Sequence, residues 1–228
     1  MVCHHRPVGG ADEETAPISL DDEAQASALE RVVFFSDAVF AIAITLLVID
    51  LRVPDLPGDA SSQAVADALL AQAPRYFAFF LSFAVIGVYW LSHWRRFQLI
   101  RRVNQRLVMI NLALLGSIAF IPFPTALIAQ FGDPVTTAIY ALTITATGLL
   151  GAVEWLYAQR AGFIDPRVSS ATVRHYAVRG LVVPGVFLAS LVVLVLFGAR
   201  ACQLSWLAIP VVQMVVERTY GREASISF

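Results

Sequence analysis

Long apolar runs separated by short polar segments dominate this chain. An α-helix needs roughly 20 apolar residues to cross the hydrocarbon core of a bilayer. Six candidate spans follow one another, at residues 32–51, 76–91, 107–130, 135–157, 176–197 and 202–216. The sixth is short, and the third contains Pro122 and Pro124, which should kink the helix or end it early. The pattern predicts an all-α membrane bundle of about six transmembrane helices.

The polar segments set the expected domain boundaries. Residues 1–28 lack the apolar core of a signal peptide and carry six acidic residues, so we expect a disordered acidic cytoplasmic tail. Residues 29–218 are expected to form the membrane domain, and residues 219–228 a short cytoplasmic tail. Residues 61–73 are only partly apolar and are expected to form an amphipathic segment at the membrane interface.

Arginine placement orients the predicted bundle, because connections on the cytoplasmic side are enriched in basic residues. The even-numbered connections and the C-terminal segment hold most of them: Arg95, Arg96, Arg101, Arg102, Arg106, Arg160, Arg167, Arg174, Arg218 and Arg222. The odd-numbered connections hold only Arg52, Arg75 and Arg200. This alternation predicts a multi-pass protein of the cell membrane with both termini in the cytoplasm.

Composition excludes several classes of protein. Mean hydropathy is +0.70 and only 14% of residues are charged, far fewer than a soluble surface requires. The net charge of −1 gives no basic field for nucleic acid. Two cysteines form no disulfide framework, and we find no nucleotide-binding, metalloprotease or hydrolase motif. We therefore expect no enzyme, no cofactor, no catalytic residue and no metal site.

Asp37 is the most informative residue, because it lies inside the first apolar span. A carboxylate there costs several kcal/mol unless it is paired or faces water. Arg31 is six residues away and does not share its helix face. A partner on another helix is expected, with His93, Arg95 and Arg96 as candidates, while Ser36 can add a short hydrogen bond. Such a group either ties helices together or takes part in ion or proton movement.

An apolar stripe follows Asp37 along the same helix. Ile42, Leu46 and Ile49 are spaced i, i+4 and i+7, and Thr45 flanks them. The stripe could simply contact lipid or another helix. If copies of this helix surround an axis, it would instead form a hydrophobic constriction that gates by dewetting, with a ring of Thr45 hydroxyls beside it.

The segment Arg31-Val32-Val33-Phe34-Phe35-Ser36-Asp37 opens the first span and resembles the start of the transmembrane protein 175 family, the lysosomal potassium channel and its bacterial homologues. The segment from Trp90 to Phe97, with His93 at its centre, is similar to a Trp/His/Arg segment of that family. Asn111-Leu112 followed by Pro122 is similar too. The resemblance covers residues 31–128 well.

The resemblance implies a homotetramer of six-span subunits with a central pore lined by the first helix. It assigns the main constriction to Ile42, continued by Leu46 and Ile49, and the hydroxyl layer for potassium preference to Thr45. It also implies a polar network that supports the pore helix, formed by Arg31, Phe35, Ser36, Asp37, Trp90 and His93. The expected partners are potassium ions and the lipid bilayer, without nucleic acid.

We therefore expect a potassium-permeable cation channel with passive conduction. The acidic tail and Asp37 could raise the cation concentration at the cytoplasmic mouth. Two alternatives stay open at this point. In a proton-coupled carrier, Asp37 and His93 would relay protons. In a non-conducting membrane scaffold, the polar motif would only pack helices together.

Overall fold

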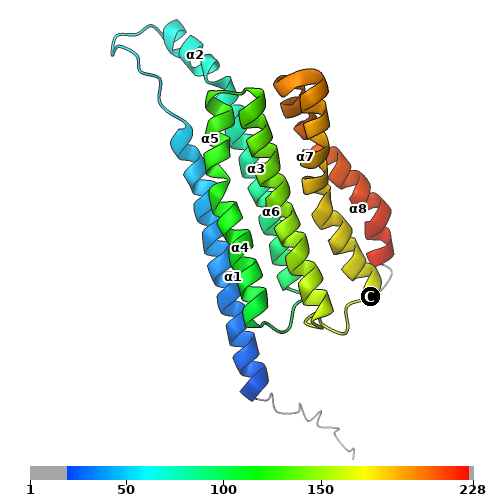
Figure 1. Cartoon of the computed structure of the whole chain (residues 1–228). Coiled ribbons are helices and arrows are strands. Elements are labelled where there is room, and N and C mark those ends of the chain that lie inside the picture. Colours follow the sequence, from blue (N-terminus) through cyan, green and yellow to red (C-terminus); the bar gives the residue numbers. More distant parts are fainter. Residues whose placement is uncertain (1–19, 226–228) are drawn as a thin grey trace, which may run out of the picture.

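The computed structural model describes residues 20–225, which form helices running up and down in one bundle (Figure 1). This confirms the predicted all-α membrane fold. In chain order the elements are α1 (Leu20–Leu46), the 3-10 turn η1 (Leu47–Asp50), α2 (Ser62–Ala71), α3 (Ala73–Phe97), α4 (Gln105–Phe120), α5 (Pro122–Gln130), α6 (Pro134–Arg160), α7 (Ser170–Ser205), the 3-10 turn η2 (Trp206–Ala208) and α8 (Ile209–Ser225).

The helical region extends beyond the predicted membrane domain at both ends. Residues 20–28, expected to be disordered, form the first turns of α1. Acidic side chains such as Asp21 and Glu23 favour this, because they complement the positive end of the helix dipole. At the other end, α8 continues to Ser225. The rest of the predicted acidic tail, residues 1–19, lies outside the described residues, as do residues 226–228.

Several helices begin at side chains that bind free backbone N–H groups. Asn104 Oδ1 accepts from the amide of Leu107 at the start of α4, and Asp133 Oδ1 accepts from two amides of α6. Ser61 and Ser169 cap α2 and α7 in the same way. These polar residues punctuate the apolar runs, so the local sequence determines where each helix starts.

Pro122 divides the third apolar run, as its position predicts. Helix α4 ends at Phe120 and α5 starts at Pro122, which occupies a first-turn position where its missing N–H removes no hydrogen bond. The two helices follow one another in nearly the same direction (Figure 1). Together they form one crossing, Gln105–Gln130.

The last two predicted spans belong to one helical stretch that folds back on itself. Among residues 20–225, five stretches are long and apolar enough to cross a membrane: Glu23–Asp50, Ala73–Phe97, Gln105–Gln130, Pro134–Arg160 and Ser170–Arg218. The fifth is 49 residues long and breaks at Gly198, whose φ of 82° is open to glycine because it has no Cβ. Beyond the break the chain turns, and α8 returns beside α7 (Figure 1). The prediction of about six membrane helices is thereby confirmed.

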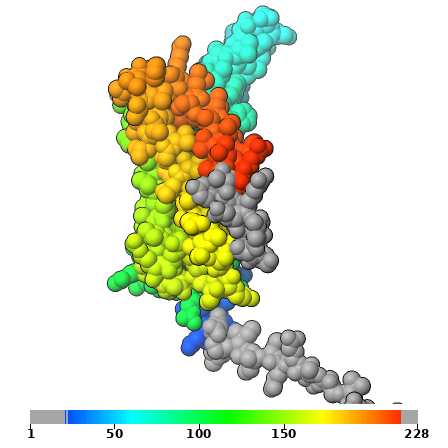
Figure 2. Space-filling model, turned by 90° about the vertical axis from the view of Figure 1, so that its right-hand side faces the viewer, coloured from blue at the N-terminus to red at the C-terminus, as the bar shows by residue number. Residues whose placement is uncertain are grey.

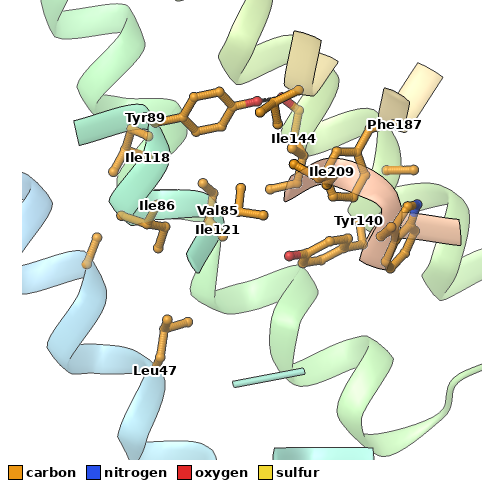
Figure 3. Packing of buried hydrophobic residues seen from close by; sticks show 14 of the residues in the cluster. Leu47, Val85, Ile86, Tyr89, Ile118, Ile121, Tyr140, Ile144, Phe187 and Ile209 are labelled. Atoms are coloured by element: carbon orange, nitrogen blue, oxygen red, sulfur yellow. Dashed lines mark hydrogen bonds between the residues drawn. The ribbon is translucent and has the colours of Figure 1, made fainter. Parts of the chain in front are cut away.

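The core brings α3, α6 and α7 together around aromatic rings (Figure 3). The ring of Tyr140 lies 5.1 Å from that of Trp206 and 5.8 Å from that of Phe187. Both buried tyrosine hydroxyls have partners: Tyr140 bonds Ser82 over 2.9 Å, and Tyr89 donates to the carbonyl of Ile144 over 2.7 Å. Such pairing is required where no water can reach a polar group.

Apolar side chains also cover much of the outer surface, which identifies that surface as lipid-facing. In Figure 2 the face made by α6, α7 and α8 is seen directly, with α2 projecting beyond one end of the bundle. Val195 on α7 is 84% exposed, and Leu196 and Phe197 next to it are also exposed. A soluble monomer rarely exposes contiguous apolar patches of this kind. The chain is a multi-pass membrane protein.

Candidate functional site

Helix α1 and the turn η1 that continues it have two faces in different surroundings. The face against the bundle is formed by Ser36, Phe40, Ala43 and Leu47, each no more than 1% exposed. The opposite face carries Ile42 (58% exposed), Leu46 (40%) and Ile49 (68%), together with Thr45, which is also exposed. The predicted stripe is therefore real, and it is directed away from the subunit's own core.

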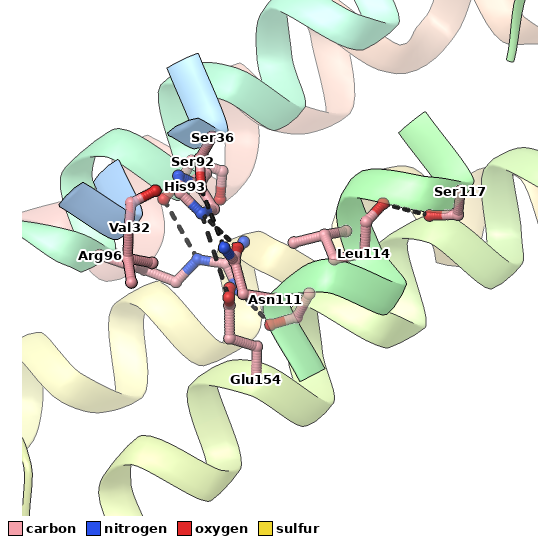
Figure 4. Close-up of polar contacts among 10 residues, drawn as sticks. Val32, Ser36, Ser92, His93, Arg96, Asn111, Leu114, Ser117 and Glu154 are labelled. Atoms are coloured by element: carbon pink, nitrogen blue, oxygen red, sulfur yellow. Dashed lines mark hydrogen bonds and ion pairs between the residues drawn. The ribbon is translucent and has the colours of Figure 1, made fainter. Parts of the chain in front are cut away.

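A chain of hydrogen bonds fastens the buried face of α1 to α4 and α3 (Figure 4). The hydroxyl of Ser36 donates to the carbonyl of Val32 over 2.7 Å and accepts from Asn111 Nδ2 over 3.0 Å. Asn111 Oδ1 lies 3.0 Å from His93 Nε2. Because an amide oxygen only accepts, this arrangement assigns the proton to Nε2 of His93. One asparagine thus joins three helices.

Asp37 is bound by Trp90 rather than by His93, Arg95 or Arg96. Its Oδ1 accepts a hydrogen bond from the indole Nε1 of Trp90 over 2.8 Å. Ser36 and Asp37 are consecutive and so point about 100° apart around the helix. Ser36 is therefore directed towards Asn111, while Asp37 lies near the edge of the buried face and stays half-buried. Asp37 and His93 make no hydrogen bond to each other within residues 20–225.

Behind this network lie two buried ionisable side chains, Arg96 on α3 and Glu154 on α6. Arg96 donates to the carbonyl of Ser92 over 3.1 Å and to the carbonyl of Gly151. Glu154 Oε1 lies 4.0 Å from His93 Nε2 (Figure 4). Glu154 is 1% exposed and so lies inside the bundle. Charges at this depth persist only when partners compensate them.

The sequence signal for Glu154 lay in its spacing from two glycines. Gly148 and Glu154 each lie three residues from Gly151, and positions three apart are neighbours on a helix surface. A Cβ on Gly148 would lie 2.7 Å from Pro184 Cγ, and a Cβ on Gly151 would lie 3.1 Å from Arg96. This face is the one that packs closely, so the acid on it is directed inward.

The other predicted network residues lie apart from these bonds. Arg31 and Phe35 are exposed, and among the described residues Arg31 has no ion-pair partner. Asn111 takes part in their place. A single Asn in an apolar span carries little signal by itself, and its role follows only from the way α1, α3 and α4 pack.

At one end of the bundle, the α3–α4 and α6–α7 connections are bound together. The amide of Arg101 donates to the carbonyl of Phe163 over 2.8 Å, and the amide of Asp165 donates to the carbonyl of Leu99 over 2.9 Å. Asp165 also pairs with Arg101 and Arg167, each at 2.8 Å. The hydrogen bonds from Arg167 and Arg101 hold the pKa of the Asp165 carboxyl well below its usual range. The predicted arginine-rich connections thus lie together at one end.

These features define a polytopic helical membrane protein whose first helix is fixed on one face by a polar motif and leaves an apolar face uncovered. Comparison with known proteins identifies its relatives. A family profile described as endosomal/lysosomal potassium channel TMEM175 matches residues 31–122 and so begins at Arg31, the first residue of the motif.

Two bacterial relatives carry the name potassium channel. The protein from Streptomyces collinus is 39% identical over 155 residues, which cover 65% of this chain and 74% of the relative. The protein from Chamaesiphon minutus is 38% identical over 135 residues, 58% of this chain and 66% of the relative. The human protein, named endosomal/lysosomal proton channel TMEM175, is 33% identical over 128 residues, and the match spans only 25% of its length.

A solved structure supports the same assignment. The crystal structure of a lysosomal potassium-selective channel TMEM175 homolog from Chamaesiphon minutus matches with a TM-score of 0.69 and 28% identity. The match covers 83% of this chain and 98% of that one. The chain belongs to the TMEM175 family, whose members and structural neighbours are ion channels and not enzymes.

Proposed function

We propose that this protein is a potassium-permeable cation channel in which four copies surround a pore lined by α1. The observation that carries the proposal is the uncovered face of α1, which is apolar although the opposite face is fixed rigidly to the bundle. The bacterial relatives named potassium channels support the choice of ion. With both features together, a channel is favoured over a carrier or a scaffold.

Ile42 would form the principal constriction, continued by Leu46 and Ile49. A ring of branched apolar side chains excludes water when narrow and conducts when wide, so it can act as a gate. Tight hydrogen bonds on the other side of α1 suit this task, because the pore side chains need a fixed support. The 3-10 turn η1 tightens the helix after Leu46, yet Ile49 remains well exposed.

Thr45 would supply a layer of oxygen atoms next to the constriction. Its hydroxyl hydrogen is directed to the carbonyl of Ile42, since Oγ1 donates there over 2.9 Å. A hydroxyl oxygen keeps lone pairs when its hydrogen is engaged. Four such oxygens around an axis would face a passing cation, which supports a role for Thr45 in the preference between potassium and sodium.

The arginine-rich end would face the cytoplasm. Basic connections concentrate on the cytoplasmic side of membrane proteins, and this end contains the α3–α4 and α6–α7 connections. The described start of α1 lies at the same end (Figure 1). Conduction would then be passive, with ions entering between the α1 helices of the assembled subunits.

Ion flux into liposomes tests the proposal directly. Purified protein is reconstituted, and potassium, sodium and proton fluxes are measured for the wild type, Ile42→Asn and Val195→Asn. Val195 is a matched control, because it is apolar and exposed but lies on α7. We expect passive flux that favours potassium, a several-fold rise in Ile42→Asn, and no change in Val195→Asn.

Two results would contradict the proposal. Equal effects of the two substitutions would place the pore away from the α1 face, and saturable flux that requires a pH gradient would indicate a carrier. Subunit number is measured independently by native mass spectrometry, where a mass other than four chains would contradict the tetramer.

A further inference from the structure

A cavity of about 700 Å³ opens at the arginine-rich end, between the first turns of α1 and the two joined connections. Gln25, Ala26 and Leu29 form its α1 side, and the segments 97–102 and 162–166 contribute the rest of the lining. The α1 side is held in place, because Gln25 Oε1 accepts a hydrogen bond from the amide of Val103 over 3.1 Å. The cavity is therefore bounded by fixed backbone on three sides.

Its lining joins an apolar floor to a positive rim. Leu29, Phe97 and Ile164 contribute apolar surface, while Arg101 and Arg102 contribute positive charge. Asp165 offsets only part of that charge, since it is shared by Arg101 and Arg167. Both of those arginine side chains remain more than half exposed, and Arg102 is exposed too. Residues 95–106 and 158–174 together hold eight arginines and one acidic residue.

The N-terminal segment, residues 1–19, has the complementary chemistry. It carries Asp12, Glu13 and Glu14 in succession, followed by the apolar pair Pro17-Ile18. The segment joins α1 at Leu20, five residues before Gln25, which is about 7.5 Å along the helix. The six extended Cα-to-Cα steps from Glu14 to Leu20 reach roughly 20 Å, so the acidic triplet can reach the rim.

We propose that residues 12–18 dock in this cavity, with the acidic triplet on the Arg101 and Arg102 side and the apolar pair on its floor. In conduction, which rests on the channel function proposed above, the docked acids act as a built-in counter-charge. The exposed arginines at the inner end repel potassium ions, and the triplet offsets part of that repulsion. Docking also holds in place the first turns of α1, the helix that carries the proposed pore face.

Disulfide trapping in the full-length protein tests docking without any flux measurement. Ala11→Cys is combined with Gln98→Cys, which lines the cavity, or with Gln105→Cys, which is exposed at the same end but outside it. Cys3 is replaced by Ser, and Cys202 is left in place because it is buried. None of these changes removes a charge. Yields are read on gels that separate cross-links within one chain from those between chains.

Docking predicts a higher cross-linking yield at position 98 than at position 105. The excess should fall roughly threefold to tenfold when Asp12, Glu13 and Glu14 are changed to Asn, Gln and Gln, and also in high salt, which weakens exposed ion pairs. Equal yields at the two positions would overturn the proposal, as would an excess that survives neutralisation. Loss of the excess in phosphatidylglycerol vesicles, but not in phosphatidylcholine, would overturn it in favour of lipid headgroups as the occupant.

Discussion

Asn111 on α4 donates a hydrogen bond of 3.0 Å to the hydroxyl of Ser36 on α1. The same amide is bonded through its oxygen to His93 on α3, so one side chain determines how three helices meet. In an apolar interior no water can replace a lost partner, and the pairing is therefore costly to break. The position of the α1 face that carries Ile42 depends on this contact.

Replacing Ser36 should destabilise the subunit. Ser36→Ala leaves Asn111 Nδ2 without its partner, and we expect a loss of about 1–3 kcal/mol in the free energy of unfolding. Ser117→Ala is the control, because its hydroxyl donates only to the carbonyl of Leu114 on its own helix. The midpoint of thermal unfolding in detergent measures both. Equal decreases of the unfolding midpoint in the two variants would show that the Asn111 contact stabilises the subunit no more than a hydrogen bond within one helix.

Charge and hydrogen bonding at Asp37 can be separated. Asp37→Asn keeps an oxygen that can accept from Trp90 but removes the charge, whereas Trp90→Phe keeps the charge and removes the donor. If the charge attracts cations, we expect Asp37→Asn to lower potassium flux several-fold with assembly intact, and Trp90→Phe to lower it less. Flux and size-exclusion profiles measure this. Failure of Asp37→Asn to assemble would favour a purely structural role.

Gly148 and Gly116 should respond in opposite directions to the same change. A Cβ on Gly148 would lie 2.7 Å from Pro184 Cγ, so Gly148→Ala must push α6 and α7 apart, at a cost of about 1–3 kcal/mol. Nothing lies within 4 Å of a Cβ on Gly116, so Gly116→Ala should stabilise α4 by about 0.5–1 kcal/mol. Thermal unfolding of both variants is the measurement, and a stable Gly148→Ala would contradict the packing.

Asp165 should hold the two arginine-rich connections together over the whole physiological pH range. Its pKa lies below the usual range because Arg167 and Arg101 stabilise the carboxylate. A carboxyl with a lowered folded pKa contributes stability above its unfolded pKa of about 3.9 and loses it only as the pH falls through the folded value. Between pH 5 and 8 the contribution is therefore constant.

Hydrogen exchange checks this expectation. After correction for intrinsic rates, the amides of Arg101 and Asp165 should show protection that does not vary from pH 5 to 8 in the wild type. Asp165→Asn should lower their protection at every pH in that range. A wild-type protection that falls between pH 8 and 5 would contradict a carboxylate that stays ionised.

Sequence reasoning predicted the helices well because their signals are local. Apolar runs of membrane length and the break at Pro122 both act within a few residues. The start of α1 was missed, because acidic residues were interpreted as disorder although they also stabilise a helix N-terminus. For Asp37, spacing gave the wrong candidates, His93, Arg95 and Arg96, whereas the family resemblance had placed Trp90, its observed partner, in the same network. The burial of Glu154 was missed although Gly151, three residues before it, lies on the face of α6 that packs closely.

Substitutions on the two faces of α1 have different consequences for the subunit. Changes at Phe40, Ala43 or Leu47 alter the core of the subunit, whereas Ile42, Thr45 and Leu46 are exposed, so changes there disturb its own packing less. The second set can therefore diversify without threatening the first. In evolution and in the laboratory alike, the proposed pore face can therefore be altered on a scaffold that stays constant.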